Sequence, residues 1–239
     1  MIFISHFFSI VFSVAILIVS TSSLFPARPA GISDVATKLH VLEELGIEFS
    51  EETRGYIKES VNNSKALWAD SGIDASQFSS YPSILLILGT RDYDMVTDSF
   101  IPLTDSLYAF DAECFDIIES YGDFLLAVSR ISGGEIHVGN YHSDVDESIF
   151  ESGIGTQEVT FDLNGHPYCF TAQFYYDWMD CGIIDFVNDI LDEQEIDKRI
   201  WCMYDGGQGF VVFYNTAEWA REFYERTGCP LAVKANEAF

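Results

Sequence analysis

The sequence predicts an α+β fold, in which a helical N-terminal half is followed by two ββα units that form an antiparallel sheet with helices packed on it. Apolar residues in the first half recur at helical spacing behind serine and proline residues. Residues 157–229 contain paired segments of alternating apolar and polar residues, and each pair is followed by an amphipathic stretch. Hydrophobic residues make up 48% of the 239 residues, which is ample material for a core.

Helical signals dominate residues 32–134. Ser33 and Ser50 each precede a segment whose apolar residues are three to four positions apart, so each serine is expected to cap a helix. The segment "SSYPSILLILG" places serine and proline before an apolar run, which favours a buried helix. The segment "SLYAF" is the short strand expected before two further helical stretches.

The first ββα unit centres on a β-hairpin. Asn164 and Gly165 separate two alternating segments, and Asn-Gly is a strong hairpin signal because both turn positions need positive φ. Asp180 is expected to cap the helix that follows, with one apolar side turned to the sheet. The other side of this helix is predicted to face solvent and carries four polar residues: Asp185, Asn188, Asp189 and Asp192.

The second ββα unit contains a segment rich in glycine, "DGGQG" (Asp205–Gly209), called here the glycine loop. A phosphate-binding loop stands between a strand and the N-terminus of a helix. Here the glycines are followed by "FVVFY", which is typical of a strand, and the next helix is expected only from Thr216 onward. The pattern therefore favours a hairpin turn over a phosphate site.

An apolar leader and linker, residues 1–31, precede the predicted single acidic α+β domain, residues 32–239. Residues 2–19 carry no charge and, as a helix, would span about 27 Å. They resemble either a signal peptide or a membrane tether, but Arg28 is the first positive residue and it follows the segment. A misassigned start or a cytoplasmic protein is the alternative. The pattern favours export or anchoring slightly over a cytoplasmic location.

Charge is the strongest global signal. The chain has 38 Asp and Glu against 12 Lys and Arg, for a formal net charge of -26. Such a surface repels nucleic acid, so no nucleic-acid partner is expected, whereas basic proteins and cations are attracted. Five cysteines are present without a C-x-x-C pair, and they are expected to be buried thiols. A Cys169–Cys181 disulfide would require export.

No catalytic motif is found, and neither a metal nor a cofactor is predicted. His142, Asp144 and Asp146 could gather around a divalent cation, but their spacing does not match an EF-hand and a solvated acidic loop is favoured. His166 and Cys169 could suggest a thiol nucleophile. The surroundings are not electropositive, which favours a structural role for both. A G-x-S-x-G motif is absent from the sequence.

The segment "YYDWMD" joins a predicted strand to a predicted helix and places aromatic residues between acids. Such a combination is well suited to binding a basic protein surface. The predicted partner-binding residues are Asp177, Trp178, Asp180, Asp185 and Asp189. The alternative is that Trp178 closes the core at this junction, since tryptophan is buried on average.

Five segments together resemble a set of uncharacterised acidic bacterial α+β proteins of similar size: "LYAFDAECFD", "ISGGE", "GTQEVTFDLNG", "YYDWMD" and "FYNTAEWAREFYERTG". The resemblance covers Ser106 to Gly228 and implies no activity and no site residues. More loosely, the composition is similar to that of immunity proteins that neutralise toxins. We therefore expect a non-enzymatic interaction protein, immunity- or inhibitor-like, that binds a basic partner. The alternative is an exported or membrane-tethered domain that binds a cation or small ligand.

Overall fold

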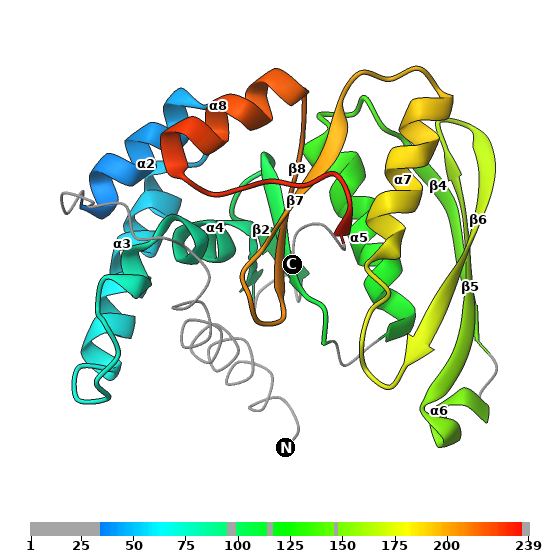
Figure 1. The fold of residues 1–239 in the computed structure, drawn as a ribbon, viewed down its shortest axis with the longest axis horizontal. Helices are drawn as coiled ribbons and strands as arrows, with labels where there is room; N and C mark the ends of the chain where they lie inside the picture. Colours follow the sequence, from blue (N-terminus) through cyan, green and yellow to red (C-terminus); the bar gives the residue numbers. More distant parts are fainter. Residues whose placement is uncertain (1–33, 95–98, 114–116, 146–147, 236–239) are drawn as a thin grey trace. The chain divides into compact units, whose positions relative to one another are not determined.

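The computed structural model describes residues 34–94, 99–113, 117–145 and 148–235, and these residues form the predicted α+β fold (Figure 1). The apolar leader, residues 2–19, lies outside the described residues. Within the described part of the chain, no helix is both long and apolar enough to span a bilayer.

The chain divides into two compact units. The first comprises Met1–Phe110, Tyr204–Val211 and Glu222–Cys229, and the second comprises Asp111–Met203, Val212–Arg221 and Pro230–Phe239. That residues 32–239 fold together as one domain therefore stays a prediction.

Helices make up most of the first unit before β1. They are α2 (Val35–Glu44), α3 (Glu51–Leu67), the 3-10 helix η2 (Gln77–Ser79) and α4 (Tyr81–Gly89). Ser50 caps α3 as predicted, and its side chain accepts a hydrogen bond from the N–H of Thr53 at 3.0 Å. The cap of α2 is Asp34 instead of Ser33, because the Asp34 carboxylate accepts the Thr37 N–H at 2.8 Å.

Three strands interrupt the helical N-terminal half, where one was predicted. β1 (Arg91–Asp94) and β2 (Ser99–Pro102) form a two-stranded antiparallel sheet, and β3 (Leu107–Asp111) is the predicted "SLYAF" strand. The α4 helix packs closely on β3. A Cβ added at Gly89 would lie 2.6 Å from the Ala109 backbone nitrogen, so only glycine fits at this end of α4.

The second unit contains a three-stranded sheet of order β4-β5-β6. Its strands are β4 (Val138–Val145), β5 (Ile154–Leu163) and β6 (His166–Tyr175), and the short helix α6 (Ser148–Ser152) precedes β5. Asn164 and Gly165 join β5 to β6 with φ of 53° and 81°, which confirms the predicted hairpin and its positive-φ turn. Pairing of β5 with β6 is continuous over ten residues, from Ile154 opposite Tyr175 to Leu163 opposite His166.

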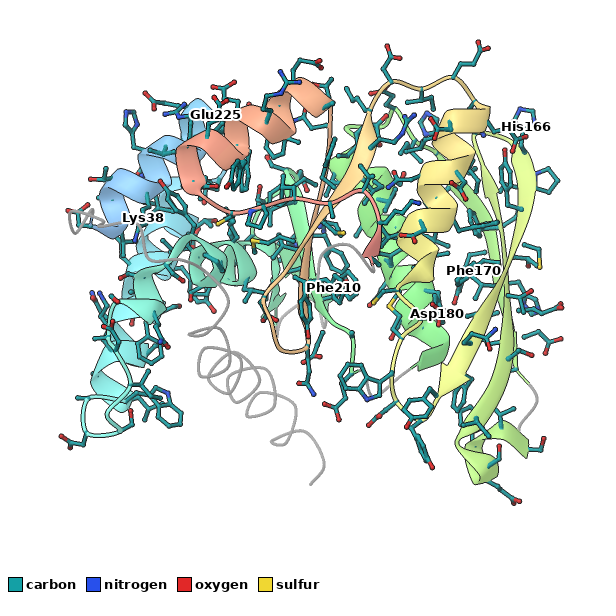
Figure 2. All side chains as sticks on the ribbon, in the orientation of Figure 1. Lys38, His166, Phe170, Asp180, Phe210 and Glu225 are labelled. Carbon is teal, nitrogen blue, oxygen red and sulfur yellow. The ribbon has the colours of Figure 1, made fainter. Side chains whose placement is uncertain are left out.

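Two helices cover the inner face of this sheet, and aromatic rings fill the contact. The helices are α5 (Ile117–Ile131) and α7 (Gly182–Glu193). Tyr121 of α5 lies with its ring centroid 6.2 Å from that of Phe170 on β6, and Phe186 of α7 lies 5.3 Å from the same ring. Figure 2 shows Phe170 on the side of the sheet that faces α7. On the opposite, outer face, the β6 residues Cys169, Thr171 and Gln173 are exposed within the described part of the chain.

Asn188 of α7 corrects the predicted solvent face of this helix, because it is buried with 6% of its surface exposed. Its side-chain amide donates to the carbonyl oxygens of Ile200 at 2.9 Å and Val233 at 2.8 Å, and its oxygen accepts the Ile200 N–H at 2.8 Å. Asp189 is exposed as predicted. The Asn188 amide thus joins α7 to two other segments of the second unit.

The second sheet of three strands has the order β3-β8-β7, with β7 (Arg199–Tyr204) and β8 (Gly209–Asn215) followed by α8 (Ala217–Thr227). Both predicted ββα units are present in chain order, as β5-β6-α7 and β7-β8-α8. Their strands lie in two separate sheets and not in the one sheet predicted. The reason is that β5 pairs with β4 and β8 pairs with β3, and both partners lie outside the two ββα units.

The glycine loop is the hairpin turn that the sequence predicts, because a strand lies on each side of it. One oxygen of the Asp205 carboxylate accepts the backbone N–H groups of Gly207 at 2.8 Å and Gly209 at 3.1 Å. The Asp205 N–H in turn donates to the Gly209 carbonyl oxygen at 3.1 Å. Two of the amides that a phosphate would need are therefore already bound by a carboxylate.

Candidate interaction surface

Exposed apolar side chains gather at the open end of the β5–β6 hairpin. Of the ten large apolar side chains that are exposed in the described residues, five lie there, with exposed fractions from 37% to 59%. We call these five residues the aromatic cluster: Phe150, Ile154, Tyr175, Tyr176 and Trp178. Exposed apolar side chains gathered at one end of an element mark an interaction site more often than single exposed residues do.

Sheet pairing and ring contacts hold the cluster together. Ile154 and Tyr175 are directly opposite each other on β5 and β6, so their side chains share the outer face. The rings of Tyr175 and Tyr176 meet edge to face with centroids 5.1 Å apart. Phe150 of α6 meets the buried Phe174 of the inner face in the same way at 5.5 Å, so it lies at the same end of the sheet but beside the inner face.

An unusual backbone places the Tyr176 ring. Tyr176 has a φ of 54°, which a bulky residue seldom adopts, and its N–H donates to the Gly153 carbonyl oxygen at 2.6 Å. Gly153 has a φ of 73°, and a Cβ at this position would lie 2.3 Å from Cε1 of Tyr176. The ring therefore lies directly on the glycine backbone, and one costly conformation, the positive φ of Tyr176, is maintained where the cluster forms.

Trp178 is at the surface and does not close the core. Its N–H donates to the Tyr175 carbonyl oxygen at 3.0 Å, and an isolated β-bridge pairs it with Glu113. The next residue, Met179, is the buried one, and its N–H donates to the Ala112 carbonyl oxygen at 2.7 Å. Residues 175–179 are thus fixed to the segment before α5, with the Trp178 side chain 37% exposed.

The five predicted partner-binding residues do not all share one role. Asp180, labelled in Figure 2, accepts the N–H of Gln173 at 2.8 Å with one carboxylate oxygen and the N–H of Gly182 at 2.9 Å with the other. The Asp185 carboxylate accepts the Ala235 N–H at 2.7 Å. Both carboxylates therefore bind backbone groups of the second unit.

The remaining three predicted residues are open to solvent. Asp177 and Trp178 lie together in the linker before α7, and Asp189 lies farther along that helix. Asp180 was predicted to cap α7, but the residue that precedes the first helical turn is Cys181. Asp180 instead holds the chain one residue earlier, through the Gly182 N–H and the contact of its own N–H with the Tyr121 hydroxyl at 3.0 Å.

Two acids that the sequence reasoning missed lie at the aromatic cluster. Glu113 forms the bridge with Trp178, and Glu151 follows Phe150 in α6; both are exposed. Together with Asp177 and the aromatic cluster they make up what we call the acidic aromatic surface. Neither glutamate is near "YYDWMD" in the sequence. Their place beside the aromatic cluster follows from the structure, through the Glu113–Trp178 bridge and the position of Glu151 next to Phe150 in α6.

The acidic aromatic surface belongs to the most acidic part of the chain. Residues 111–197 contain 20 Asp and Glu and a single basic residue, Arg130, which leaves 18 acidic and 11 basic side chains for all other positions. Most of the net charge of -26 is therefore concentrated in this stretch. The local potential is strongly negative, so a cationic surface is attracted and an anionic one is repelled.

The other candidate sites remain apart. His142 and Asp144 lie on the exposed face of β4, and Asp146 lies outside the described residues. In the part of the chain that the structure describes, no three His, Cys, Asp or Glu side chains come close enough to hold a metal ion. His166 and Cys169 are both exposed on β6. Cys229, in contrast, is buried, and burial raises the pKa of its thiol to about 12.

Comparison with known proteins adds no relative from which a role could be transferred. No protein-family model, no curated protein and no solved structure matches this chain.

Proposed function

We propose that this protein is a non-enzymatic interaction protein that binds a basic protein partner through the acidic aromatic surface. One observation carries the proposal. Half of the large apolar side chains exposed in the described residues lie at one end of a hairpin, inside the stretch that holds most of the negative charge.

The aromatic side chains suit the centre of an interface. Tyrosine and tryptophan provide large contact areas at a low cost in side-chain entropy and dominate many binding energies. Here Tyr176 is already held against Gly153, and Trp178 is held by the bridge to Glu113. Because these positions are fixed before a partner arrives, little ordering remains to be done on binding.

The acids act at longer range. Glu113, Glu151 and Asp177 lie around the aromatic side chains and are exposed, so salt screens them. Charges in such a position speed the encounter with an oppositely charged partner more than they strengthen the final complex. The proposal therefore expects an association rate that falls as salt is added.

Comparative capture tests the proposal. The wild-type chain, Trp178→Ala with Tyr176→Ala, and Leu126→Ala are immobilised side by side and exposed to the same cell extract. Leu126 is the matched control, because it is an exposed apolar residue on α5 outside the acidic aromatic surface. A true partner is captured by the wild type and by Leu126→Ala but lost with the aromatic double variant.

The captured partner is then purified for kinetic measurements. Trp178→Ala should weaken binding by about 2 kcal/mol, or roughly 30-fold, mainly through faster dissociation. Asp177→Asn with Glu151→Gln should slow association and leave dissociation almost unchanged. If all three immobilised proteins are folded and capture the same set of proteins, the acidic aromatic surface is not an interface and the proposal is wrong.

A further inference from the structure

The backbone of β6 presents hydrogen-bonding groups along one edge of its sheet. β6 is the last strand in the order β4-β5-β6 among the described strands. Leu163 and His166 close the two-residue turn, so His166 and every second residue after it form backbone hydrogen bonds with β5. The residues between them, Cys169 and Thr171 among others, direct their N–H and C=O groups away from β5.

Two contacts verify this direction. The Gln173 N–H donates outside the sheet, to the Asp180 carboxylate, and the Tyr175 carbonyl oxygen accepts the N–H of Trp178. Pro167 occupies an outward position at the other end of β6, where the missing N–H costs no sheet hydrogen bond. The available edge is therefore short and centres on Cys169 and Thr171.

Other sheet edges of the second unit are protected. β7 pairs at Cys202 with Ala232, and two backbone hydrogen bonds of 2.8 and 2.9 Å join them. β4 has a register shift between Gly139 and His142, and Asn140 has a φ of 50°. Such irregularities are the usual protection of an edge strand. β6 is regular and carries no Asp, Glu, Lys or Arg in its ten residues.

The two faces beside this edge differ in chemistry. On the outer face, Thr171 lies opposite Glu158 of β5, and Glu158 lies opposite Asp144 of β4. A lysine or arginine on an added strand, placed beside Thr171, would extend over this short side chain toward Glu158. On the inner face the half-buried rings of Phe170 and Phe186 lie 5.3 Å apart and would receive apolar side chains.

We propose that β6 is a docking edge for an extended segment of the basic partner, in which basic residues alternate with apolar ones. Main-chain hydrogen bonds to Cys169 and Thr171 would provide the pairing, and the two faces would select the alternation. This inference rests on the proposed function for the identity of the partner as a basic protein. A second copy of the chain is a poor occupant, because its net charge of -26 would be brought against Glu158 and Asp144.

The test uses the full chain and a defined probe, an acetylated ten-residue peptide of alternating lysine and valine. Amide hydrogen exchange is followed by NMR at Cys169 and Thr171. At a peptide concentration about ten times its Kd, exchange at both amides should slow about tenfold. The same peptide with glutamate for lysine, and one N-methylated on the edge that faces β6, should leave both rates unchanged.

Thr171→Pro provides the protein-side arm, since it removes one outward N–H at a position equivalent to Pro167. It should weaken lysine–valine peptide binding at least tenfold, whereas Thr171→Val, which keeps the N–H, should not. If Thr171→Pro does not fold, the N-methylated peptide still decides the question. The proposal is overturned if the peptide leaves both amides unprotected, if the glutamate peptide protects them equally, or if self-association protects them without any peptide.

These outcomes are separable from those of the proposed function. If the peptide protects Cys169 and Thr171 while the aromatic variants capture the same proteins as the wild type, the docking edge stands and the proposed function fails. If capture depends on Trp178 but no peptide protects the two amides, the proposed function stands and the docking edge is wrong.

Discussion

Replacement of Asn188 by leucine should destabilise the protein far more than its place on a polar-looking helix face suggests. The side chain is similar in size, so the change tests hydrogen bonding and not volume. It removes three hydrogen bonds, those to the Ile200 N–H, the Ile200 carbonyl and the Val233 carbonyl. Asn188 itself is buried, so water cannot readily replace the lost partner.

The expected magnitude follows from these three groups. A buried polar group that loses its partner costs about 1–3 kcal/mol, and burial of the leucine side chain returns about 1–2 kcal/mol. Three such groups cost about 3–9 kcal/mol, so after this return we expect the free energy of unfolding to fall by about 1–8 kcal/mol, against the roughly 5–15 kcal/mol typical of a domain.

Urea titration followed by tryptophan fluorescence measures this change. Asp189→Leu is the matched control, because it makes a similar replacement at the exposed neighbour and should stay within about 0.5 kcal/mol of wild type. The reasoning fails if Asn188→Leu lowers the free energy of unfolding by less than about 1 kcal/mol, or if both variants lower it equally. The Asn188 amide would then not be the link between α7 and the segments that contain Ile200 and Val233.

Four further predictions concern other parts of the molecule. In the same urea titration, Gly153→Ala should lower the free energy of unfolding more than Gly165→Ala does. Both positions have positive φ, but only a Cβ at position 153 would meet a tyrosine ring. An equal loss of stability in the two variants would contradict the ring contact. Iodoacetamide at pH 8 should modify exposed Cys169 in the native protein but Cys229 only after unfolding, which mass spectrometry measures. The reason is that burial raises the pKa of Cys229 to about 12 and keeps it a thiol. Residues 32–239 alone should remain soluble and give the circular dichroism of a folded chain. If this truncated chain is insoluble while the full chain folds in detergent, the leader is part of the fold. Millimolar ATP, GTP or NAD should leave the melting temperature unchanged, and a clear increase would contradict the hairpin assignment of the glycine loop.

Local signals in the sequence determined the parts of the fold that could be predicted. Asn164-Gly165 specifies a hairpin through the φ angles of two adjacent residues, and Ser50 specifies a helix start through one hydrogen bond three residues away. Asp180 was assigned as a cap one residue too far from the helix, an error of the size that helix ends usually allow.

Long-range pairing could not be predicted in the same way. The two ββα units look alike in sequence, but the choice of β4 for β5 and of β3 for β8 depends on the whole arrangement of the chain. Asn188 was misplaced for a related reason. A polar residue on a helix has the same pattern whether it meets water or the backbone of a distant segment, and here the segment around Ile200 and Val233 replaces the water.

The candidate surface shows the same division. Aromatic residues and acids are adjacent in "YYDWMD", so Asp177 and Trp178 were found at once, whereas Glu113 and Glu151 come from separate segments. In the sequence, Asp180 and Asp185 look like Asp177, an acid close to aromatic residues. Only the structure shows that their carboxylates accept the Gln173 and Ala235 N–H groups.

The segment after α8 has a consequence for the order of events during synthesis. Ala232, Val233 and Ala235 supply backbone partners to Cys202, Asn188 and Asp185, three positions made much earlier. While the ribosome is still translating α8, residues 111–203 can form the β5–β6 hairpin, but the Asn188 amide and the edge of β7 still lack their partners. The second unit can therefore close only after residues 232–235 have left the ribosome, and until then the β7 edge at Cys202 lacks its Ala232 partner.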